Sequence, residues 1–451
     1  MTATRPNILL VITHGMGRHL GCYGAPVVTP GLDRLAATGM RLDRCFCVGA
    51  QSSPSRGAML TGRYPHRNGL MGLAHLGWQL HAGERCLPHL LARAGYDTHI
   101  FGFAHGSHDP ARLGYAHVSD PAPDAAGIAA AAAGFLQAQP ATRPRQAPFF
   151  ALVGLHEAQR PFPTMPCAAP PGMPAFLPDL APLRSEIAGL NALVARADRA
   201  LTTILDALDG GGPPRADTLV LFTTDQGIAM PGAAGTCYDA GLGTALLVRW
   251  PGHIPPARRS EALLSHVDLL PTLLAAAGAP PPSDPALDGR SFLPLLLGQP
   301  FTPASHIFFE MTWHDRYNPM RGVRTPRFKY VRNFDPDAPA VYLPADIYRS
   351  PSGMALRGAY YARRRAPEQF FDLKTDPLER DNAVSDPTLR AEVGPLRTLV
   401  AAQMIASADP LCRGPVSAPA RQVQRLLDER QRQELTGPLT AGERAVLGVL
   451  A

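Results

Sequence analysis

Short apolar runs alternate with longer amphipathic stretches from the N-terminus to Ala277, and this order limits the fold more than any other feature. The runs have the length and residue types of buried strands: Ile8–Thr13, Thr98–Phe103, Phe149–Leu155, Thr218–Thr223 and Ala245–Arg249. The stretches with helical periodicity are Thr29–Thr38, Cys86–Ala94, Gly127–Gln137, Leu183–Leu208 and His266–Ala277. The alternation predicts an α/β fold with a central, mostly parallel sheet flanked by helices, whose ligands bind beyond the carboxyl ends of the strands.

The pattern changes after Leu287–Pro300. Three shorter runs then read as strands of a second sheet, followed by one helix and a charged helical segment: Ser305–Met311, Arg321–Thr325, Phe328–Arg332, Leu389–Ile405 and Arg421–Glu434. We therefore predict a large α/β domain (1–300), a smaller α+β domain (301–410) and a helical C-terminal extension (411–451). The charged helix suggests a surface segment through which the chain could form oligomers.

Composition narrows the class of protein further. The chain has 451 residues, 45% of them hydrophobic and 18% charged, which is typical of a soluble globular protein. Its longest apolar run near the N-terminus, Ile8–Ile12, is too short for a signal peptide or a membrane span, so we expect a cytoplasmic protein. The seven cysteines form no Cys-x-x-Cys pair, and the net charge of +6 comes without the basic, aromatic patches of nucleic-acid-binding proteins.

The stretch "GAQSSPSRGAMLTGR" (Gly49–Arg63) is the first candidate for a catalytic or anion-binding site. Pro54 fits the first turn of a helix, which puts Ser52 next to free N–H groups and the positive end of the helix dipole. Arg56, one turn later, could donate to the same bound anion. A simpler interpretation is that Ser52 or Ser53 only caps the helix, and the residues alone leave both open.

Eight segments, in order along nearly the whole chain, resemble one family. They are "RPNILLVITHGMG", "TPGLDRLAATGMRLDRCF", "SSPSRGAMLTGRYPHRNG", "LFTTDQG", "YDAGLGTALLVRWPG", "SHVDLLPTLLAAAG", "LDGRSFLPLLLG" and "FFDLKTDPLERDN". Together they are similar to the sulfatases of the alkaline phosphatase superfamily. Within that family, "GLMGLAHLGWQL" and "FFEMTWHDRYNPMRGVRTPRFKYVRNF" most resemble the heparan N-sulfatase (sulfamidase) branch.

The resemblance implies a large α/β domain, a smaller domain with an antiparallel sheet, and hydrolysis of sulfated sugars. It places Ser52 at the position of the formylglycine nucleophile, which is made from Cys or Ser after translation, and Arg56 at an anion-binding position. It also implies a calcium ion, held by an Asp pair after the first strand and an Asp-Asn or Asp-His pair after a later one. Several carboxylate oxygens suit such a hard cation.

The chain departs from this pattern at the metal positions. His14-Gly15 stands where the family has its Asp pair, while Asp225 is kept and Gln226 replaces Asn or His. At most one of the three carboxylates implied by the resemblance remains, so we expect much weaker calcium binding. Ordinary turnover should then be absent or very slow, because the ion acts as Lewis acid and template.

Sulfate-facing positions are altered too. His105 and His156 are kept as catalytic candidates, but Phe103 and Ala234 stand where the family has basic residues. In the small domain, Glu310, Thr312, His314, Tyr317 and Arg321 fit the sulfamidase-like pattern. Of these, Glu310, His314 and Arg321 are our candidates for sugar binding, with a structural role in the small sheet as the open alternative.

Three functions follow from this site. The first is a sulfatase or sulfamidase with modified Ser52 and a weakened metal site. The second is a sulfatase-fold protein that binds an anionic sugar, or a partner, without turnover. The third is a rewired phospho- or sulfo-hydrolase that uses unmodified Ser52 and zinc held by His14, His105, His156 and Asp225, since His/Asp sets suit zinc.

Overall fold

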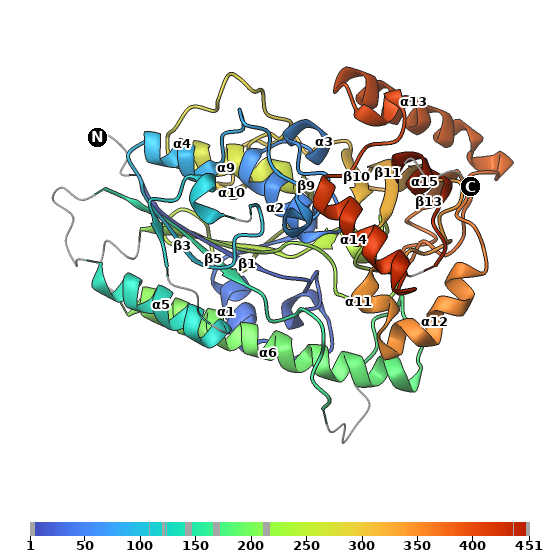
Figure 1. Ribbon diagram of the computed structural model, residues 1–451. Helices are drawn as coiled ribbons and strands as arrows, with labels where there is room; N and C mark the ends of the chain where they lie inside the picture. Colours follow the sequence, from blue (N-terminus) through green and yellow to red (C-terminus); the bar gives the residue numbers. More distant parts are fainter. Residues whose placement is uncertain are drawn as a thin grey trace.

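The structure is a computed structural model that describes residues 5–107, 109–119, 122, 124–139, 147–165, 172–210, 217–435 and 437–447. Figure 1 shows a large sheet covered by helices on both faces and, beside it, a smaller C-terminal region with its own sheet. None of the described helices combines the length and apolar character that crossing a membrane would need.

The large sheet has the strand order β4-β3-β5-β1-β6-β8-β2-β7, and β9 pairs with β2. Its strands are β1 (Asn7–Thr13), β2 (Met40–Phe46), β3 (Asp97–Gly102), β4 (His117–Val118), β5 (Phe149–Leu155), β6 (Thr218–Thr224), β7 (Gly243–Thr244), β8 (Leu246–Arg249) and β9 (Arg258–Ser265). The central strand β1 is parallel to β5 and β6, while β8 is antiparallel to β6 and β2. The predicted fold class, a mostly parallel sheet, is confirmed.

Helices cover both faces of this sheet (Figure 1). One face carries α1 (Pro30–Thr38), α5 (Ala125–Ala138) and α6 (Ala181–Asp209); the other carries α2 (Ser52–Thr61), α3 (Pro65–Asn68), α4 (Leu87–Arg93), α9 (Leu269–Ala276) and α10 (Leu293–Leu296). The side chains of β1 alternate between these layers: Leu9 and Val11 belong to the core with α5 and α6, Ile8 and Leu10 to the core with α4 and α9. Burial on both faces explains why this strand is apolar throughout.

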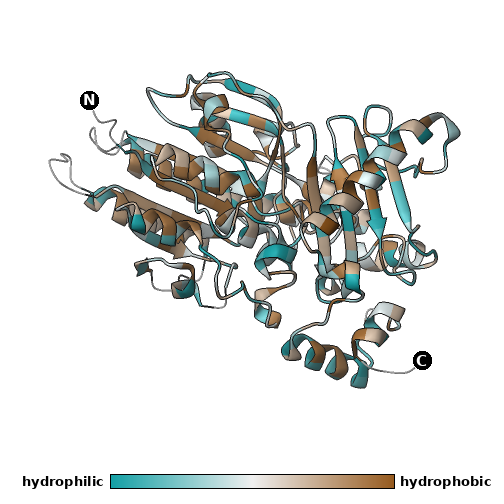
Figure 2. Ribbon diagram, turned by 90° about the horizontal axis from the view of Figure 1, so that it is seen from above, coloured by the Kyte–Doolittle hydropathy of each residue, from teal (hydrophilic) through white to brown (hydrophobic). Residues whose placement is uncertain are grey.

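The smaller sheet is antiparallel, in the order β10-β11-β12-β13. Its strands are β10 (Ile307–Trp313), β11 (Tyr317–Arg324), β12 (Phe328–Asn333) and β13 (Glu368–Asp372). The helices around it are α11 (Ala345–Tyr348), α12 (Pro351–Tyr361), α13 (Arg390–Ala406), α14 (Ala420–Gln431) and α15 (Ala441–Leu447). Figure 2 shows hydrophobic residues concentrated in the strands and on one side of the helices, which is the pattern of two packed cores.

The sequence prediction missed several elements, and each lacks a continuous apolar run. Strand β2 interleaves Arg41, Asp43 and Arg44 with its apolar residues, and β9 begins with exposed charged residues. The short β13 and the helix α12 were also not predicted. The predicted domain limits at 300 and 410 stay predictions, and the last four residues of the predicted extension lie outside the described residues.

The C-terminal helix α14 packs on the chain itself. Gln422 is fully buried, accepts a hydrogen bond from Trp78 Nε1 at 2.7 Å, and donates to the backbone oxygen of His314 at 2.8 Å. Leu426 is buried in the core of the small domain. The other face of α14 is charged, and a role in oligomer contacts stays a prediction.

Candidate active site

Helix α2 places Ser52 at its N-terminal end. Gln51 is extended (φ −152°, ψ 145°) and occupies the N-cap position, so Ser52 is the first helical residue and does not cap the helix. The helix ends at Gly62, whose φ of 66° is the left-handed conformation that glycine adopts without strain. Ser53 accepts a hydrogen bond from the backbone of Ala74, whereas Ser52 makes none within the described part of the chain. Ser52 is therefore available to a ligand at a positive helix end.

Asp225, directly after β6, is the centre of the site. Its Oδ2 accepts from Arg56 Nε at 3.0 Å and lies 3.1 Å from His14 Nδ1, and its Oδ1 accepts from the backbone N–H of Gly15 at 2.9 Å. Asp225 and Arg56 are both fully buried. Burial alone would raise the pKa of Asp225, but the charges of His14 and Arg56 hold it well below its usual range.

His105, in the loop after β3, completes a cluster with His14 and Asp225. The ligand atoms of these three side chains all lie within 4.8 Å of one another, and the two imidazole rings meet edge to face. Burial, followed by the charge of Arg56, lowers the pKa of His105 well below its ordinary value, so its imidazole is neutral. His105 also has a φ of 54°, an uncommon backbone conformation that often marks functional residues.

Several buried polar atoms around Asp225 have no hydrogen-bond partner among the described residues. They are Arg56 Nη2, His105 Nδ1, His156 Nδ1 and Gln226 Oε1. These residues follow β3, β5 and β6 or lie on α2, so the carboxyl edge of the sheet brings them together as predicted for ligand sites. His156 stands beside Phe103, with their ring centroids 5.5 Å apart. Because buried polar groups are normally paired, these atoms indicate a site built for a polar ligand.

The residues present do not fit calcium. That ion takes 6–8 oxygen ligands, whereas Asp225 is the only carboxylate among the predicted metal residues His14, Asp225 and Gln226 and already accepts three donors of its own chain. Gln226 Oε1 is the only other side-chain oxygen of the predicted metal residues. The His14–His105–Asp225 cluster has the nitrogen-rich donor set that zinc prefers.

The three sugar-binding candidates of the small domain, Glu310, His314 and Arg321, all contact other charged side chains of the protein. Glu310 pairs with His66 and accepts the backbone N–H of that residue at 2.8 Å, thereby fixing the start of α3. Arg321 faces Glu310 across β10 and β11, and its Nη2 donates to Asp409 at 3.0 Å. His314 lies 3.0 Å from Asp315. These contacts show that Glu310 and Arg321 hold parts of the fold together. The structure shows no contact of either side chain with Ser52 or Asp225.

Two features near the site were not predicted. Ser55 Oγ donates to the backbone oxygen of Asp225 at 2.5 Å and lies 3.0 Å from His266 Nδ1, so Ser55 and His266 tie the start of α2 to the Asp225 loop. Burial lowers the pKa of His266 to about 3, which keeps it neutral. Ala234 packs with Leu343 and Ile347 in a small apolar cluster. The segment "SHVDLLPT", which resembles the family, contains His266, but nothing in the sequence indicated that this residue contacts the start of α2.

Comparison with known proteins identifies the family to which this fold and site belong. The sulfatase family profile matches residues 6–279, and the profile "N-sulphoglucosamine sulphohydrolase, C-terminal" matches residues 235–354. The chain belongs to the sulfatase family, and within it to the sulfamidase-like branch.

Individual relatives span most of the chain. It is 29% identical to human N-sulphoglucosamine sulphohydrolase, over 90% of this chain and 91% of that protein. It is 30% identical to human arylsulfatase A, over 84% of this chain and 83% of that protein. A solved structure in complex with its substrate D-glucosamine-2-N,6-O-disulfate superimposes with a TM-score of 0.69 at 20% identity, covering 90% of this chain and 99% of that one. The fold of the family is thus present along most of the chain.

Proposed function

We propose that this protein binds the sulfate group of a sulfated amino sugar at the Ser52 end of α2, and that calcium-dependent turnover there is absent or very slow. The observation that carries the proposal is that the carboxylate of Asp225 is already hydrogen-bonded and charge-paired within the protein. Arg56, His14 and the N–H of Gly15 satisfy both of its oxygens, so the last carboxylate of the expected calcium site serves as an internal counter-ion.

The anion-binding half of the site supports the sugar-binding part of the proposal. Ser52 begins α2, and Arg56 Nη2 and one ring nitrogen each of His105 and His156 are buried without a hydrogen-bond partner among the described residues. A helix N-terminus and a guanidinium are suitable donors for a sulfate group. The sugar class follows from the relatives, since one of them is named for N-sulphoglucosamine.

Calcium binding gives the sharpest test. We expect no heat of binding and no change in melting temperature when the wild-type protein is titrated with calcium chloride. The matched variant H14D/G15D restores the Asp pair and should gain calcium binding. An aspartate fits at position 15 for two reasons. A Cβ there would lie 3.5 Å from its nearest neighbour, the backbone oxygen of Ala158, and Asp is among the residues that adopt a left-handed φ such as the 57° found here. Micromolar calcium binding by the wild-type protein would refute the proposal.

Turnover is tested separately on protein expressed with a maturase that acts on Ser. Mass spectrometry of the Ser52 peptide shows conversion to formylglycine as a loss of two hydrogens. With Ser52 converted, we expect hydrolysis of an aryl sulfate far below the range of about 1–10³ s⁻¹ typical of enzymes. A rate inside that range would show that the rewritten metal positions do not prevent the family's reaction.

A second candidate function is favoured by the His14–His105–Asp225 cluster, which zinc could occupy. Bound zinc supplies a Lewis acid that lowers the pKa of a coordinated hydroxyl or water. Unmodified Ser52 would then be the nucleophile toward a phosphate or sulfate ester, with Arg56 orienting the anion. Metal analysis of the purified protein decides this: one equivalent of zinc, lost in the H14A/H105A variant, supports it, and metal-free protein contradicts it. The cytoplasmic location stays a prediction.

A further inference from the structure

A cavity of about 400 Å³ lies beside the small sheet, and its lining is separate from the residues of the Ser52 site. We call it the arginine cavity, because its lining includes Arg363, Arg364, Arg365, Arg380, Tyr238 and Tyr360. The loop after β6, the end of α12 and the segments around β13 supply these residues. Neither Ser52 nor Arg56, His105 or Asp225 lines it. Its volume is that of an ordinary small-ligand site.

Three of the four guanidinium groups have no carboxylate partner within the described ranges. Arg365 is only 7% exposed, and its Nη1 donates to the neutral Oδ1 of Asn318 at 2.7 Å. Arg380 donates to a backbone oxygen at 3.0 Å, and the exposed Arg363 makes no side-chain hydrogen bond or ion pair. A buried cation without a counter-ion is costly. Arg365 therefore marks a place where an anion would lower the free energy of the protein.

The single carboxylate in the lining does not serve as that anion. Glu379 is buried and forms an ion pair with Lys329 at 2.7 Å, and Lys329 also pairs with Asp239 at 2.9 Å. Its charge is thus already balanced within the protein. The arginine cavity keeps an excess of positive charge.

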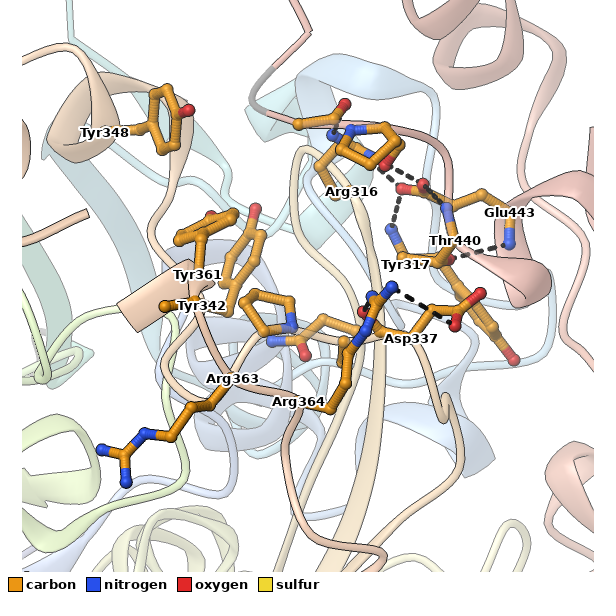
Figure 3. Close-up of a pocket in the computed structure, with 16 residues that line it drawn as sticks. Arg316, Tyr317, Asp337, Tyr342, Tyr348, Tyr361, Arg363, Arg364, Thr440 and Glu443 are labelled. Carbon is orange, nitrogen blue, oxygen red and sulfur yellow. Dashed lines mark hydrogen bonds and ion pairs between the residues drawn. The ribbon is translucent and has the colours of Figure 1, made fainter. Parts of the chain in front are cut away.

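A neighbouring cavity of about 460 Å³ provides the contrast. The two cavities share Arg363 and Arg364, but the charges of the neighbour are internally paired: Arg316 with Glu443, and Arg364 with Asp337. Figure 3 shows Arg364 directed toward Asp337, while Arg363 points away from this cavity. Of the arginines without a carboxylate partner among the described residues, Arg365 and Arg380 line the arginine cavity alone, and Arg363 lines both cavities.

We propose that the arginine cavity is a second saccharide site, which binds the sulfate groups of an oligosaccharide at a distance from Ser52. The ligand class rests on the proposed function; the site itself rests on the unpaired arginines. Aromatic side chains for the sugar rings are present, since Tyr360 and Phe176 both line the cavity. They come together at Gly232, where a Cβ would lie 3.8 Å from Tyr360 Oη and 3.9 Å from the ring of Phe176.

The test measures binding of a heparin-derived hexasaccharide to the full chain by calorimetry. The variant R363S/R380S removes two exposed cations from the cavity. The variant R390S/R413S makes the same charge change at two exposed positions, one in the small domain and one in the C-terminal extension, that line neither cavity. We expect the cavity variant to weaken binding at least about tenfold and the control to change it less than about twofold. The desulfated, N-acetylated hexasaccharide should bind neither protein measurably.

The outcomes separate the two proposals. Equal dissociation constants for the two variants, or equal binding of the desulfated ligand, overturn the arginine cavity as a sulfate site. The monosaccharide N-sulfoglucosamine reports on the Ser52 site, and its affinity should be unchanged in R363S/R380S. If the monosaccharide does not bind at all, the proposed function fails, while the hexasaccharide comparison still judges the cavity. Circular dichroism confirms that each variant is folded.

Discussion

The substitution Asp225→Asn tests whether the centre of the site is an internal ion-pair network. It keeps the shape of the side chain but removes the charge that three donors share. It also replaces one acceptor oxygen by a donor NH₂ group, which faces either Arg56 or Gly15. Arg56 is then left fully buried, and the backbone oxygen of Phe103 is its remaining hydrogen-bond partner among the described residues.

The expected loss of stability is large. Removing one partner of a buried charge pair costs about 3–5 kcal/mol, because the other charge stays desolvated. The matched control is Asp198→Asn. Asp198 is also buried and accepts the N–H groups of Gly31 and Leu32 at 3.0 and 2.8 Å, but it forms no ion pair with any described residue, and burial raises its pKa. Its substitution should cost only about 1 kcal/mol, as for an N-cap.

The assay is denaturant unfolding of both variants and the wild type in EDTA, followed by circular dichroism. The pKa of Asp225 is depressed in the folded state, so its contribution is present above the unfolded carboxyl pKa of about 3.9 and is lost as the pH falls below that value. D225N should lack this acid-sensitive component. Equal destabilisation by D225N and D198N, or a strong loss of wild-type stability in EDTA, would refute the internal ion-pair network.

Three further predictions concern residues around the site. His266 is neutral in the folded protein with a pKa lowered to about 3, so its contribution to stability is lost as the pH falls from about 6.5 toward 3, and H266Q should flatten that part of the pH–stability curve. D409N leaves Arg321 buried without its bidentate partner and should cost about 3 kcal/mol in urea unfolding, with no change in monosaccharide affinity. A234K should lower stability by at least about 1–3 kcal/mol through overpacking and should not raise sulfate affinity, as calorimetry can show.

Secondary structure was predicted correctly from the sequence where the pattern of apolar residues matches the burial of the element. Strand β1 is apolar because both of its faces are buried, and its limits were predicted within one residue. Strand β2 was missed because its charged residues find partners only in the folded chain, such as Asp43 with Arg259 from β9. The small-domain sheet was predicted as antiparallel, and this is confirmed.

The candidate site was predicted less completely. The family resemblance selected Ser52, Arg56, His14 and Asp225, and the structure brings the last three into direct contact. The contact of Arg56 with Asp225 could not be read from spacing, because it depends on how α2 docks against the end of β6. The pairing of Arg321 with Asp409 was also invisible, since it joins positions 88 residues apart.

The packing of Ala234 limits where positive charge can be added to this protein. The family resemblance implies a basic side chain at this position, but here Leu343 and Ile347 pack with the alanine methyl group. A lysine at position 234 would meet these side chains before it could reach a sulfate. A basic residue there therefore requires smaller residues at positions 343 and 347 as well, so a redesign of the sulfate site has to change three positions together.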